Sequence, residues 1–361
     1  MTIPRAISPL RVGNMPVDHP SRRVVLRGLG AMCGAFAAPG GHAQPVAERP
    51  AVVVLPGPGS SVSLPFELAL KLGLDRQLGL PLRLKFEGGG GILIQELQGG
   101  NAEFAAFGLP AAMEANAAGR AQLVALAAVH GLPVYTLLVR SDLRGSVRRI
   151  ADLRGRVIGL HNNSLQNRTT AQQLAEQVFA SRGVPVDSLR FMSSGQSWES
   201  MSAALRGQSV DAVMADGTLA IQIEDEGLAF RLFSTGVPAD AATVPGAGFL
   251  RAALIGRRDR VEAGPERTAR MVSLVRRTLE WIAARPAQEM ADALQLQGTA
   301  RQAVISAARL YPRQYSPDGR FSAGQLRETE LFFRSSNPDL PAAARYSVES
   351  MVIDRWAGRQ P

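Results

Sequence analysis

A strand and an amphipathic helix follow one another in residues 156–182, whose sequence is RVIGLHNNSLQNRTTAQQLAEQVFASR. The apolar run Arg156–Leu160 has the length and composition of a buried strand, and apolar residues recur at helical spacing from Arg168 to Arg182. The same order of parts then continues with strands at Leu189–Met192 and Val210–Met214 and helices at Glu199–Leu205 and Leu219–Glu226. Strands that alternate with helices of about 10–15 residues predict an α/β unit with a doubly wound parallel sheet.

A first α/β unit with the same order of parts precedes this one. Its expected strands are Ala51–Leu55, Leu80–Phe86, Phe104–Phe107, Leu123–Val129 and Tyr135–Val139. Its helices are expected to begin near Leu64, Ile92 and Pro110. After a last strand-like run, Gly248–Ile255, the sequence is strongly helical, and further helices are expected at 322–334 and 340–356. The chain therefore predicts two α/β units and additional C-terminal helices.

The composition is that of a soluble globular protein. Hydrophobic residues make up 46% of the 361 residues and charged residues 20%. No uncharged stretch approaches the roughly 18 apolar residues that a membrane span needs. The formal net charge is +9, of which residues 1–43 contribute +4, and the remaining arginines are scattered. Because no long basic run is interleaved with aromatic residues, we expect no nucleic-acid partner.

The N-terminus predicts export. Residues Ser21–Arg27 resemble the twin-arginine motif, with Val25 at the place that is usually Phe. A mildly apolar stretch follows, and Gly41 and Ala43 suit signal-peptidase cleavage before Gln44. Residues 1–43 are therefore interpreted as a signal peptide and the mature protein as periplasmic. A disordered cytosolic tail is the alternative, and the choice between Met1 and Met15 as start, or between the Sec and twin-arginine routes, stays open.

Cys33 is the single cysteine of the chain and lies inside the predicted signal peptide. The mature protein would then have no disulfide, no thiolate nucleophile and no cysteine metal site. A lipid anchor at Cys33 is the rival interpretation, but Met32 is a poor fit to the small residue that lipidation requires before the cysteine. We therefore expect a free periplasmic protein.

Four stretches of the sequence contain motifs that occur in the order and spacing of a known protein family. They are Pro65–Leu80, Gly99–Phe104 (with Glu103 at the usual Asp place), Ala151–Gly159 (ADLRGRVIG) and Ala204–Ala212 (ALRGQSVDA). These stretches resemble the periplasmic binding proteins of nitrate, sulfonate, taurine and thiamine-precursor ABC importers. The resemblance spans roughly residues 50–284.

The resemblance implies the type II periplasmic-binding-protein fold, in which two doubly wound lobes are joined by a hinge and bind a ligand between them. On that basis lobe one is 50–142 plus 248–300, lobe two is 147–240, and 301–361 is a helical extension packed on the lobes. The implied partners are a small-molecule ligand and an ABC permease of the inner membrane. We expect a monomer without a cofactor or metal.

The expected ligand contacts lie in loops that lead from strands into helices, because ligands of doubly wound sheets bind there and helix N-termini favour anions. They are Ser60, Ser61, Gly89, Gly90, Gly108, Leu109, His161, Asn162, Ser164, Gln196, Trp198, Asp216 and Thr218. Each has a plainer interpretation. The glycines suit tight turns, the serines and Asp216 suit helix caps, His161 is an ordinary loop residue, and Trp198 packs near the hinge instead of stacking on a ligand. The family usually has Gly where Asn163 stands, which puts the backbone geometry of that loop in question.

The sequence contains no pattern of residues that points clearly to catalysis. After residue 43 the histidines are His130 and His161, no His pair has metal-ligand spacing, and no G-x-S-x-G motif occurs. The alternatives to a binding protein are an enzyme of the same fold, as in pyrimidine-forming or menaquinone-pathway relatives, and a periplasmic sensor module. The helix N-termini and hydroxyls favour an organic solute with an acidic group. Asp216 and Trp198 would instead suit an amine or an aromatic solute, and the nearest rim arginine, Arg168, lies in the first turn of its helix.

Overall fold

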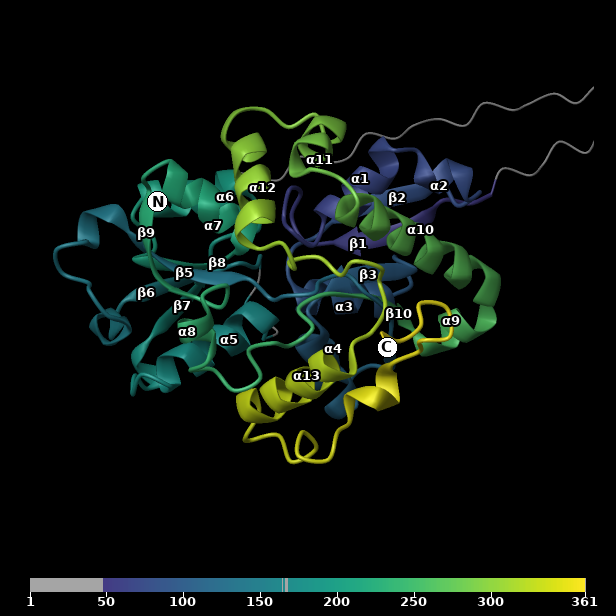
Figure 1. The fold of residues 1–361 in the computed structure, drawn as a ribbon. Coiled ribbons are helices and arrows are strands. Elements are labelled where there is room, and N and C mark those ends of the chain that lie inside the picture. The colour runs from purple at the N-terminus through teal and green to yellow at the C-terminus, as the bar shows by residue number, and fades with distance from the viewer. Residues whose placement is uncertain (1–47, 164, 166–167, 361) are drawn as a thin grey trace, which may run out of the picture. The chain divides into compact units, whose positions relative to one another are not determined.

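The computed structural model describes residues 48–163, 165 and 168–360. The predicted signal peptide and Ser164 lie outside these residues. From Ala47 onward the chain forms one structural unit, which contains two five-stranded sheets with helices around each (Figure 1). The prediction of two α/β lobes is confirmed.

The first sheet has the strand order β2-β1-β3-β10-β4. Its strands are β1 (Ala51–Leu55), β2 (Leu82–Phe86), β3 (Phe104–Phe107), β4 (Leu123–Ala128) and β10 (Ala253–Arg257). β1 is parallel to β2 and β3, whereas β10 runs antiparallel to β3 and β4. The helices of this lobe are α1 (Leu64–Lys71), α2 (Leu74–Gln77), α3 (Gly90–Gln98), α4 (Leu109–Ala117), α9 (Arg258–Ala263) and α10 (Pro265–Ala283).

The second sheet has the order β7-β6-β8-β5-β9. Its strands are β5 (Tyr135–Arg140), β6 (Val157–Leu160), β7 (Arg190–Ser193), β8 (Ala212–Asp216) and β9 (Ala229–Ser234). β5 is antiparallel to both of its neighbours, β8 and β9. The helices are α5 (Thr170–Ala180), α6 (Trp198–Arg206), α7 (Gly217–Asp225) and α8 (Pro238–Ala241), and 3₁₀ turns occur at Ser141–Leu143, Ile150–Leu153 and Val186–Ser188.

The chain crosses between the sheets twice, from β4 to β5 and from β9 to β10. The strand that follows each crossing, β5 or β10, is antiparallel to its neighbours. The sheets are therefore mixed, whereas the sequence pattern predicted purely parallel sheets. β5 belongs to the second sheet, although we expected residues up to 142 in the first lobe. The pairing partners of β5, β8 and β9, lie about 75–95 residues away in sequence, and the local pattern carries no information on them.

The C-terminal helices α11 (Ala287–Ala293), α12 (Gly298–Leu310) and α13 (Ala323–Ser336) contact both lobes. α12 packs against α7 and α11, while α13 packs against α4 and α5. The helix expected at 340–356 is wrong, because only a 3₁₀ turn forms there, at Val348–Met351. Pro338 and Pro341 disfavour helical backbone at the residues that precede them.

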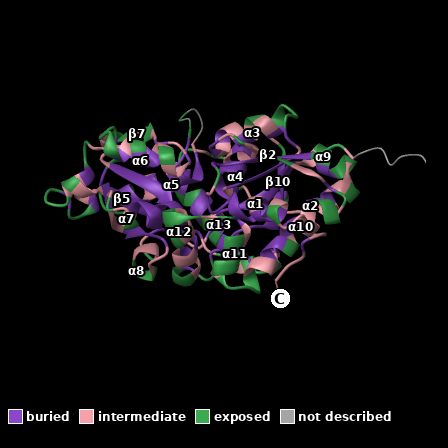
Figure 2. Cartoon of the chain, turned by 90° about the horizontal axis from the view of Figure 1, so that it is seen from above, coloured by how far each residue is buried: buried purple, intermediate pink, exposed green. Residues whose placement is uncertain are grey.

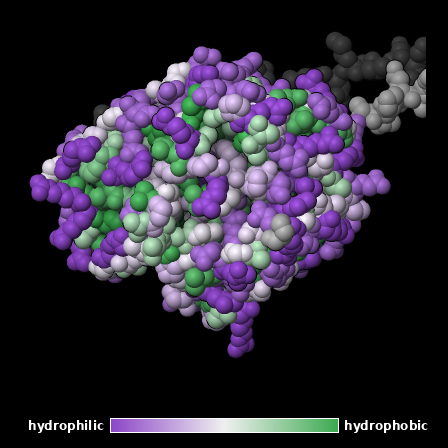
Figure 3. Space-filling view, in the orientation of Figure 1, coloured by the Kyte–Doolittle hydropathy of each residue, from purple (hydrophilic) through white to green (hydrophobic). Residues whose placement is uncertain are grey.

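The central strands of each sheet are buried between helices, which explains their largely apolar sequences. β1, β3, β4 and β8 are buried along their whole length and belong to the buried interior in Figure 2, whereas the edge strands β2 and β7 are partly exposed. The face drawn in Figure 3 is mainly hydrophilic, with small hydrophobic areas between. In the described part of the chain no helix combines the length and the apolar character needed to cross a bilayer.

Candidate functional site

A small cavity of ≈40 Å³ lies where the loops after the strands of the two lobes meet. The first lobe contributes Pro56, Val62, Gly90, Phe107, Gly108 and Ala111, and the second contributes His161, Thr169, Thr170, Ala171 and Gln196. Tyr135 and Arg251, which complete the lining, come from the two crossings between the lobes. The cavity therefore lies at the carboxyl ends of the parallel strands, where doubly wound sheets bind ligands.

Three helices begin at this cavity. Gly90 is the first residue of α3, Gly108 precedes α4, and Thr169 caps α5 by accepting a hydrogen bond from Gln172 N at 3.2 Å. Helix N-termini present unpaired N–H groups and a partial positive charge. α3 and α4 belong to the first lobe and α5 to the second, so the charge is focused on the cavity from both sides.

Arg251 is the cation of the cavity, and only 2% of it is exposed. Its Nη1 donates to His130 Nδ1 at 3.2 Å and to the Ser61 hydroxyl, and its Nη2 lies 3.5 Å from Asp216 Oδ2. The guanidinium also lies over the Tyr135 ring, with 4.5 Å between its central carbon and the ring centroid. Burial alone would lower the pKa of Arg251, but Tyr135 and the Asp216 carboxylate outweigh it and the pKa is raised. The side chain is therefore a fixed positive charge.

Two polar groups of the lining have no hydrogen-bond partner among the described residues. They are Nε of Arg251 and the hydroxyl of Thr170, and both atoms are buried. An unpaired buried polar group destabilises the protein by about 1–3 kcal/mol. Because the arginine nitrogen can only donate and the hydroxyl can donate, the cavity offers two donors to an incoming acceptor.

The histidines near the cavity are neutral. Burial, reinforced by Arg251, lowers the pKa of His130 to about 3. Since arginine only donates, Nδ1 of His130 is an acceptor and its Nε2–H donates to Ser61 O at 3.2 Å. Burial also lowers the pKa of His161, whose Nε2 lies 3.4 Å from Gln196 O.

Asp216 connects the lobes. Its Oδ2 accepts from Ser61 N, in the first lobe, at 3.0 Å, while its Oδ1 caps α7 through Thr218 N and Leu219 N. Burial alone would raise the pKa of Asp216, but the charge of Arg251, together with hydrogen bonds from Leu219 N and Ser61 N, outweighs it and the pKa is lowered. The carboxylate is therefore ionised, with its oxygens engaged by the protein.

Glycines allow the two rims to touch. A Cβ atom at Gly57 would lie 2.1 Å from Gln196 O, one at Gly88 2.0 Å from Asn163 Nδ2, and one at Gly108 2.0 Å from Thr170 Oγ1. Each contact joins a loop of the first lobe to a loop of the second. Gly57 N also donates to the Gln196 side chain at 3.1 Å. A Cβ at Gly57 or Gly108 would therefore hold these segments apart, whereas a Cβ at Gly88 would meet only the end of the Asn163 side chain, which can turn away.

The structure brings some of the predicted contacts together. Gly90, Gly108, His161 and Gln196 line the cavity. Ser61, Gly89, Asn162 and Asp216 lie around it, and the side chain of Asn162 is buried with no partner among the described residues.

Other predicted contacts lie elsewhere. Leu109 belongs to the core of the first lobe, and the Ser60 hydroxyl bonds to Ser63 at 3.0 Å. Trp198 is outside the lining, because as the first residue of α6 it packs on a core cluster of the second lobe that includes Met201 and Leu205. Thr218 lines a different pocket. Asp216 is a helix cap and a bridge between lobes, which is the plainer of its two interpretations.

Sequence reasoning missed Arg251, Thr170 and Tyr135. Arg251 carried a usable signal, because it is the charged residue within the otherwise apolar run Gly248–Ile255, and arginine is rarely buried without a partner. Thr170 and Tyr135 had none, since a helix-start threonine and a strand tyrosine are both ordinary.

The site is equipped to bind an anion. Among the described residues that line the cavity there is no Cys, Asp or Glu. Across the described residues, no cluster of three or more His, Cys, Asp or Glu side chains is placed to hold a metal ion. A fixed positive charge, unpaired hydrogen-bond donors and loops from two lobes that meet around the cavity are features suited to the capture of a solute.

Two sheets that exchange strands through two crossings, with a site between them, define the fold of the two-lobed periplasmic binding proteins. The chain belongs to the NMT1/THI5-like family, whose model matches residues 61–289. Among curated protein sequences none matches this chain.

Solved structures with this fold differ in function. A protein of Bordetella bronchiseptica RB50 is 20% identical, with a TM-score of 0.77 over 87% of this chain and 97% of its own. The alkanesulfonate-binding protein of Xanthomonas axonopodis pv. citri, bound to MOPS, is 18% identical, with a TM-score of 0.65 over 84% and 98%. A desulfurization enzyme is 14% identical, with a TM-score of 0.54 over 85% and 97%. At these identities the likeness establishes the fold.

Proposed function

We propose that this protein is the exported solute-binding component of an ABC importer and that it captures a small organic anion, a sulfonate or a carboxylate, between its lobes. The observation that carries the proposal is Arg251, a buried cation whose Nε lacks a partner among the described residues. The Thr170 hydroxyl beside the same cavity and the three helix N-termini add to its preference for negative charge.

Capture requires the lobes to move. The cavity of ≈40 Å³ is close to the roughly 30 Å³ that one water occupies in the liquid. An organic anion therefore enters when the lobes separate, and the two crossings are the segments about which they turn. In this structure the lobes are joined by hydrogen bonds from Ser61 N to Asp216 and from Gly57 N to Gln196, so we expect the lobes to lie further apart around a bound anion than they do here.

Specificity for an anion follows from the charge balance. Arg251 and Asp216 neutralise one another, but the oxygens of Asp216 are engaged by Ser61, Thr218 and Leu219. The unpartnered groups of the lining, Arg251 Nε and the Thr170 hydroxyl, can both donate, and Asn162 beside the cavity adds one unpaired donor and one unpaired acceptor. An ammonium group would have to displace these bonds and face Arg251, so we expect amines to be rejected.

The proposal is tested by a thermal-shift and calorimetric screen of the mature protein, Gln44 to Pro361, against sulfonates, carboxylates and amines. A ligand at a hundred times its dissociation constant stabilises the folded state by about 2.7 kcal/mol. We expect hits confined to the acids. Hits confined to the amines, or none in a folded sample, would contradict the proposed ligand class.

The variant Thr170→Val locates the site without disturbing the fold, because the hydroxyl has no partner among the described residues. It should weaken binding of the acid at least tenfold, since a hydrogen bond to a charged group contributes about 1.5–3 kcal/mol. The matched control is Thr278→Val on α10, whose buried hydroxyl donates to Leu274 O at 2.8 Å. Equal affinities of the two variants would place the ligand elsewhere.

Delivery to a permease separates an importer component from the sensor alternative. A strain that lacks the neighbouring permease genes should lose uptake of the identified solute while the purified receptor still binds it. Unchanged uptake would favour the sensor, and conversion of the solute by the purified protein would favour an enzyme of the same fold.

A further inference from the structure

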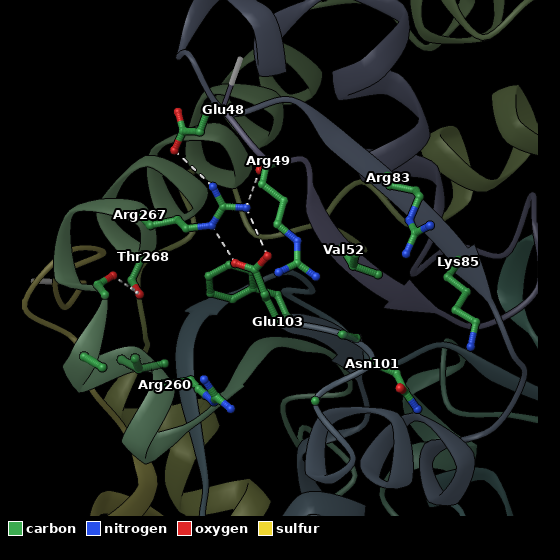
Figure 4. Close-up of a pocket in the computed structure, with 16 residues that line it drawn as sticks. Glu48, Arg49, Val52, Arg83, Lys85, Asn101, Glu103, Arg260, Arg267 and Thr268 are labelled. Carbon is green, nitrogen blue, oxygen red and sulfur yellow. Dashed lines mark hydrogen bonds and ion pairs between the residues drawn. The ribbon is translucent and has the colours of Figure 1, made fainter. Parts of the chain in front are cut away.

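A second, larger cavity of ≈1000 Å³ lies at the opposite edge of the first sheet (Figure 4). It is lined by residues at the start of β1, along β2, before and at the start of β3, and on α9 and α10. The carboxyl ends of β1 and β3 lead to the cavity between the lobes. A five-residue strand is about 16 Å long, so the two cavities are separated by that order of distance.

Most of the acidic groups at this outer pocket are already paired. Arg267 donates to both oxygens of Glu103 and contacts Glu48, which also binds Arg270 at 2.6 Å. Figure 4 shows Arg267 between the two carboxylates. On the opposite side Lys85 forms ion pairs with Glu87 and Glu96, at 2.9 and 2.8 Å.

Three arginines that line the outer pocket take no part in these ion pairs. No ion pair involves Arg49, Arg83 or Arg260 among the described residues, although all three line the pocket. Asp259, the neighbour of Arg260 in sequence, is held by Arg257. In Figure 4 the guanidinium groups of Arg49 and Arg83 extend into the space from above and Arg260 faces it from the other side.

The base of the pocket is apolar and well packed. It includes Val52, Ala102, Phe104 and Val261, each at most 8% exposed. Unpaired cations that converge over a dry surface concentrate positive potential in a concave space. A planar guanidinium group can donate two parallel hydrogen bonds to one carboxylate or phosphate group. Three guanidinium groups from different elements therefore suit a molecule that carries several carboxylate or phosphate groups.

We propose that the outer pocket is a second binding site, for a small polyanion that carries two or more carboxylate or phosphate groups. It differs from the cavity between the lobes in place and in ligand class, and it does not rest on the function proposed above. The polyanion bridges Arg49 and Arg83 on one side and Arg260 on the other, and its occupancy is independent of lobe closure because all of its contacts lie in the first lobe.

The experiment is isothermal titration calorimetry of the mature protein with citrate and with inorganic pyrophosphate, at low and high NaCl. We expect at least one of them to bind, and the affinity to fall at least tenfold between 0.05 and 0.5 M NaCl, since exposed charges are screened. The pair of ligands distinguishes carboxylate from phosphate preference. Acetate and methanesulfonate are the monovalent controls and should not compete.

The double variant Arg49→Gln/Arg83→Gln should weaken polyanion binding at least tenfold. Both side chains are exposed, so the fold is retained. Arg182→Gln, an exposed arginine of the second lobe, is the matched control, and Thr170→Val should also leave this binding unchanged. Absence of citrate and pyrophosphate binding, wild-type binding by the double variant, or loss of binding in Thr170→Val would each overturn the proposal.

Discussion

The cavity between the lobes and the outer pocket of the first lobe are both built around arginine, but they handle its charge in opposite ways. Arg251 is buried, and its charge is met by Asp216, His130 and the Tyr135 ring before any ligand arrives. Arg49 and Arg83 are exposed and have no acidic partner among the described residues. The first cavity measures ≈40 Å³ and the second ≈1000 Å³.

The difference follows from solvation. A buried guanidinium without partners would be prohibitively unstable, so the protein must supply them and leave only the donors that a ligand will use. An exposed guanidinium is solvated by water and is therefore stable without an acidic partner until a ligand binds. A buried site thereby gains selectivity and insensitivity to salt, whereas an exposed site binds more loosely and responds to ionic strength.

The largest effect is expected for Arg251→Met. We expect solute binding to weaken more than a hundredfold, and the free energy of unfolding to fall by about 3–5 kcal/mol because Asp216 is left buried and unpaired. Calorimetry and denaturant unfolding measure the two losses. Polyanion binding at the outer pocket should be unaffected in the folded fraction.

A second variant separates folding from binding. Arg251→Met with Asp216→Asn removes both charges, so stability should largely return while solute binding stays lost. If solute binding also returned, Arg251 would not be the anion contact, and the contrast between the two arginine sites would fail.

A smaller effect, of about tenfold on solute affinity, is expected for Gly108→Ala. The new Cβ would meet Thr170 Oγ1 at 2.0 Å, so the lobes cannot reach the closed arrangement, while the backbone at this position suits any residue. Small-angle scattering with saturating solute should show a more open variant. Gly145→Ala, with open space around it, is the control, and polyanion binding should be equal in both.

A further effect concerns stability in acid. The pKa of His130 is about 3 in the folded protein and about 6.5 when unfolded, so the unfolded chain binds the extra proton below pH 6.5. Stability should therefore fall with pH from about 6.5 downward, with a slope of up to 1.4 kcal/mol per pH unit for this residue. Asp216, whose pKa is lowered, adds to the same loss below about pH 4.

Replacing His130 by Gln isolates this contribution. In thermal unfolding from pH 7.5 to 4.5, His130→Gln should lose stability less steeply than the wild type. An unchanged slope would mean that the pKa of His130 in the folded protein is close to its value in the unfolded chain, which would contradict the burial of this histidine.

The sequence predicts the fold well because its signals are local. Apolar runs such as Val210–Met214 and the helix periodicity of 170–180 fix each element from its own residues. The strand-to-helix loops also identify the edge at which the cavity lies, through residues such as His161 and Gln196. Both kinds of information depend on neighbours within a few positions.

What could not be predicted depends on partners distant in the chain. β5 joins the second sheet through strands that come about 75–95 residues later, and Arg251 meets His130 and Ser61 across 121 and 190 residues. The outer pocket unites Arg49 with Arg260 in the same way. For Trp198 the sequence left ligand stacking and packing both open, because an aromatic residue at a helix start suits either role, and in the structure the side chain packs on a core cluster of the second lobe.

Under the function proposed above, the rim glycines also restrict which substitutions can change the solute that the protein binds. A side chain at Gly57 or Gly108 would separate segments of the two lobes whatever the ligand, so we expect substitutions at these two positions to weaken binding of every solute. Ala111 and Ala171, in the first turns of α4 and α5, line the same cavity without joining the rims. New specificities would arise first at these two alanines, and a library that varies them is the shortest route to a receptor for a different solute.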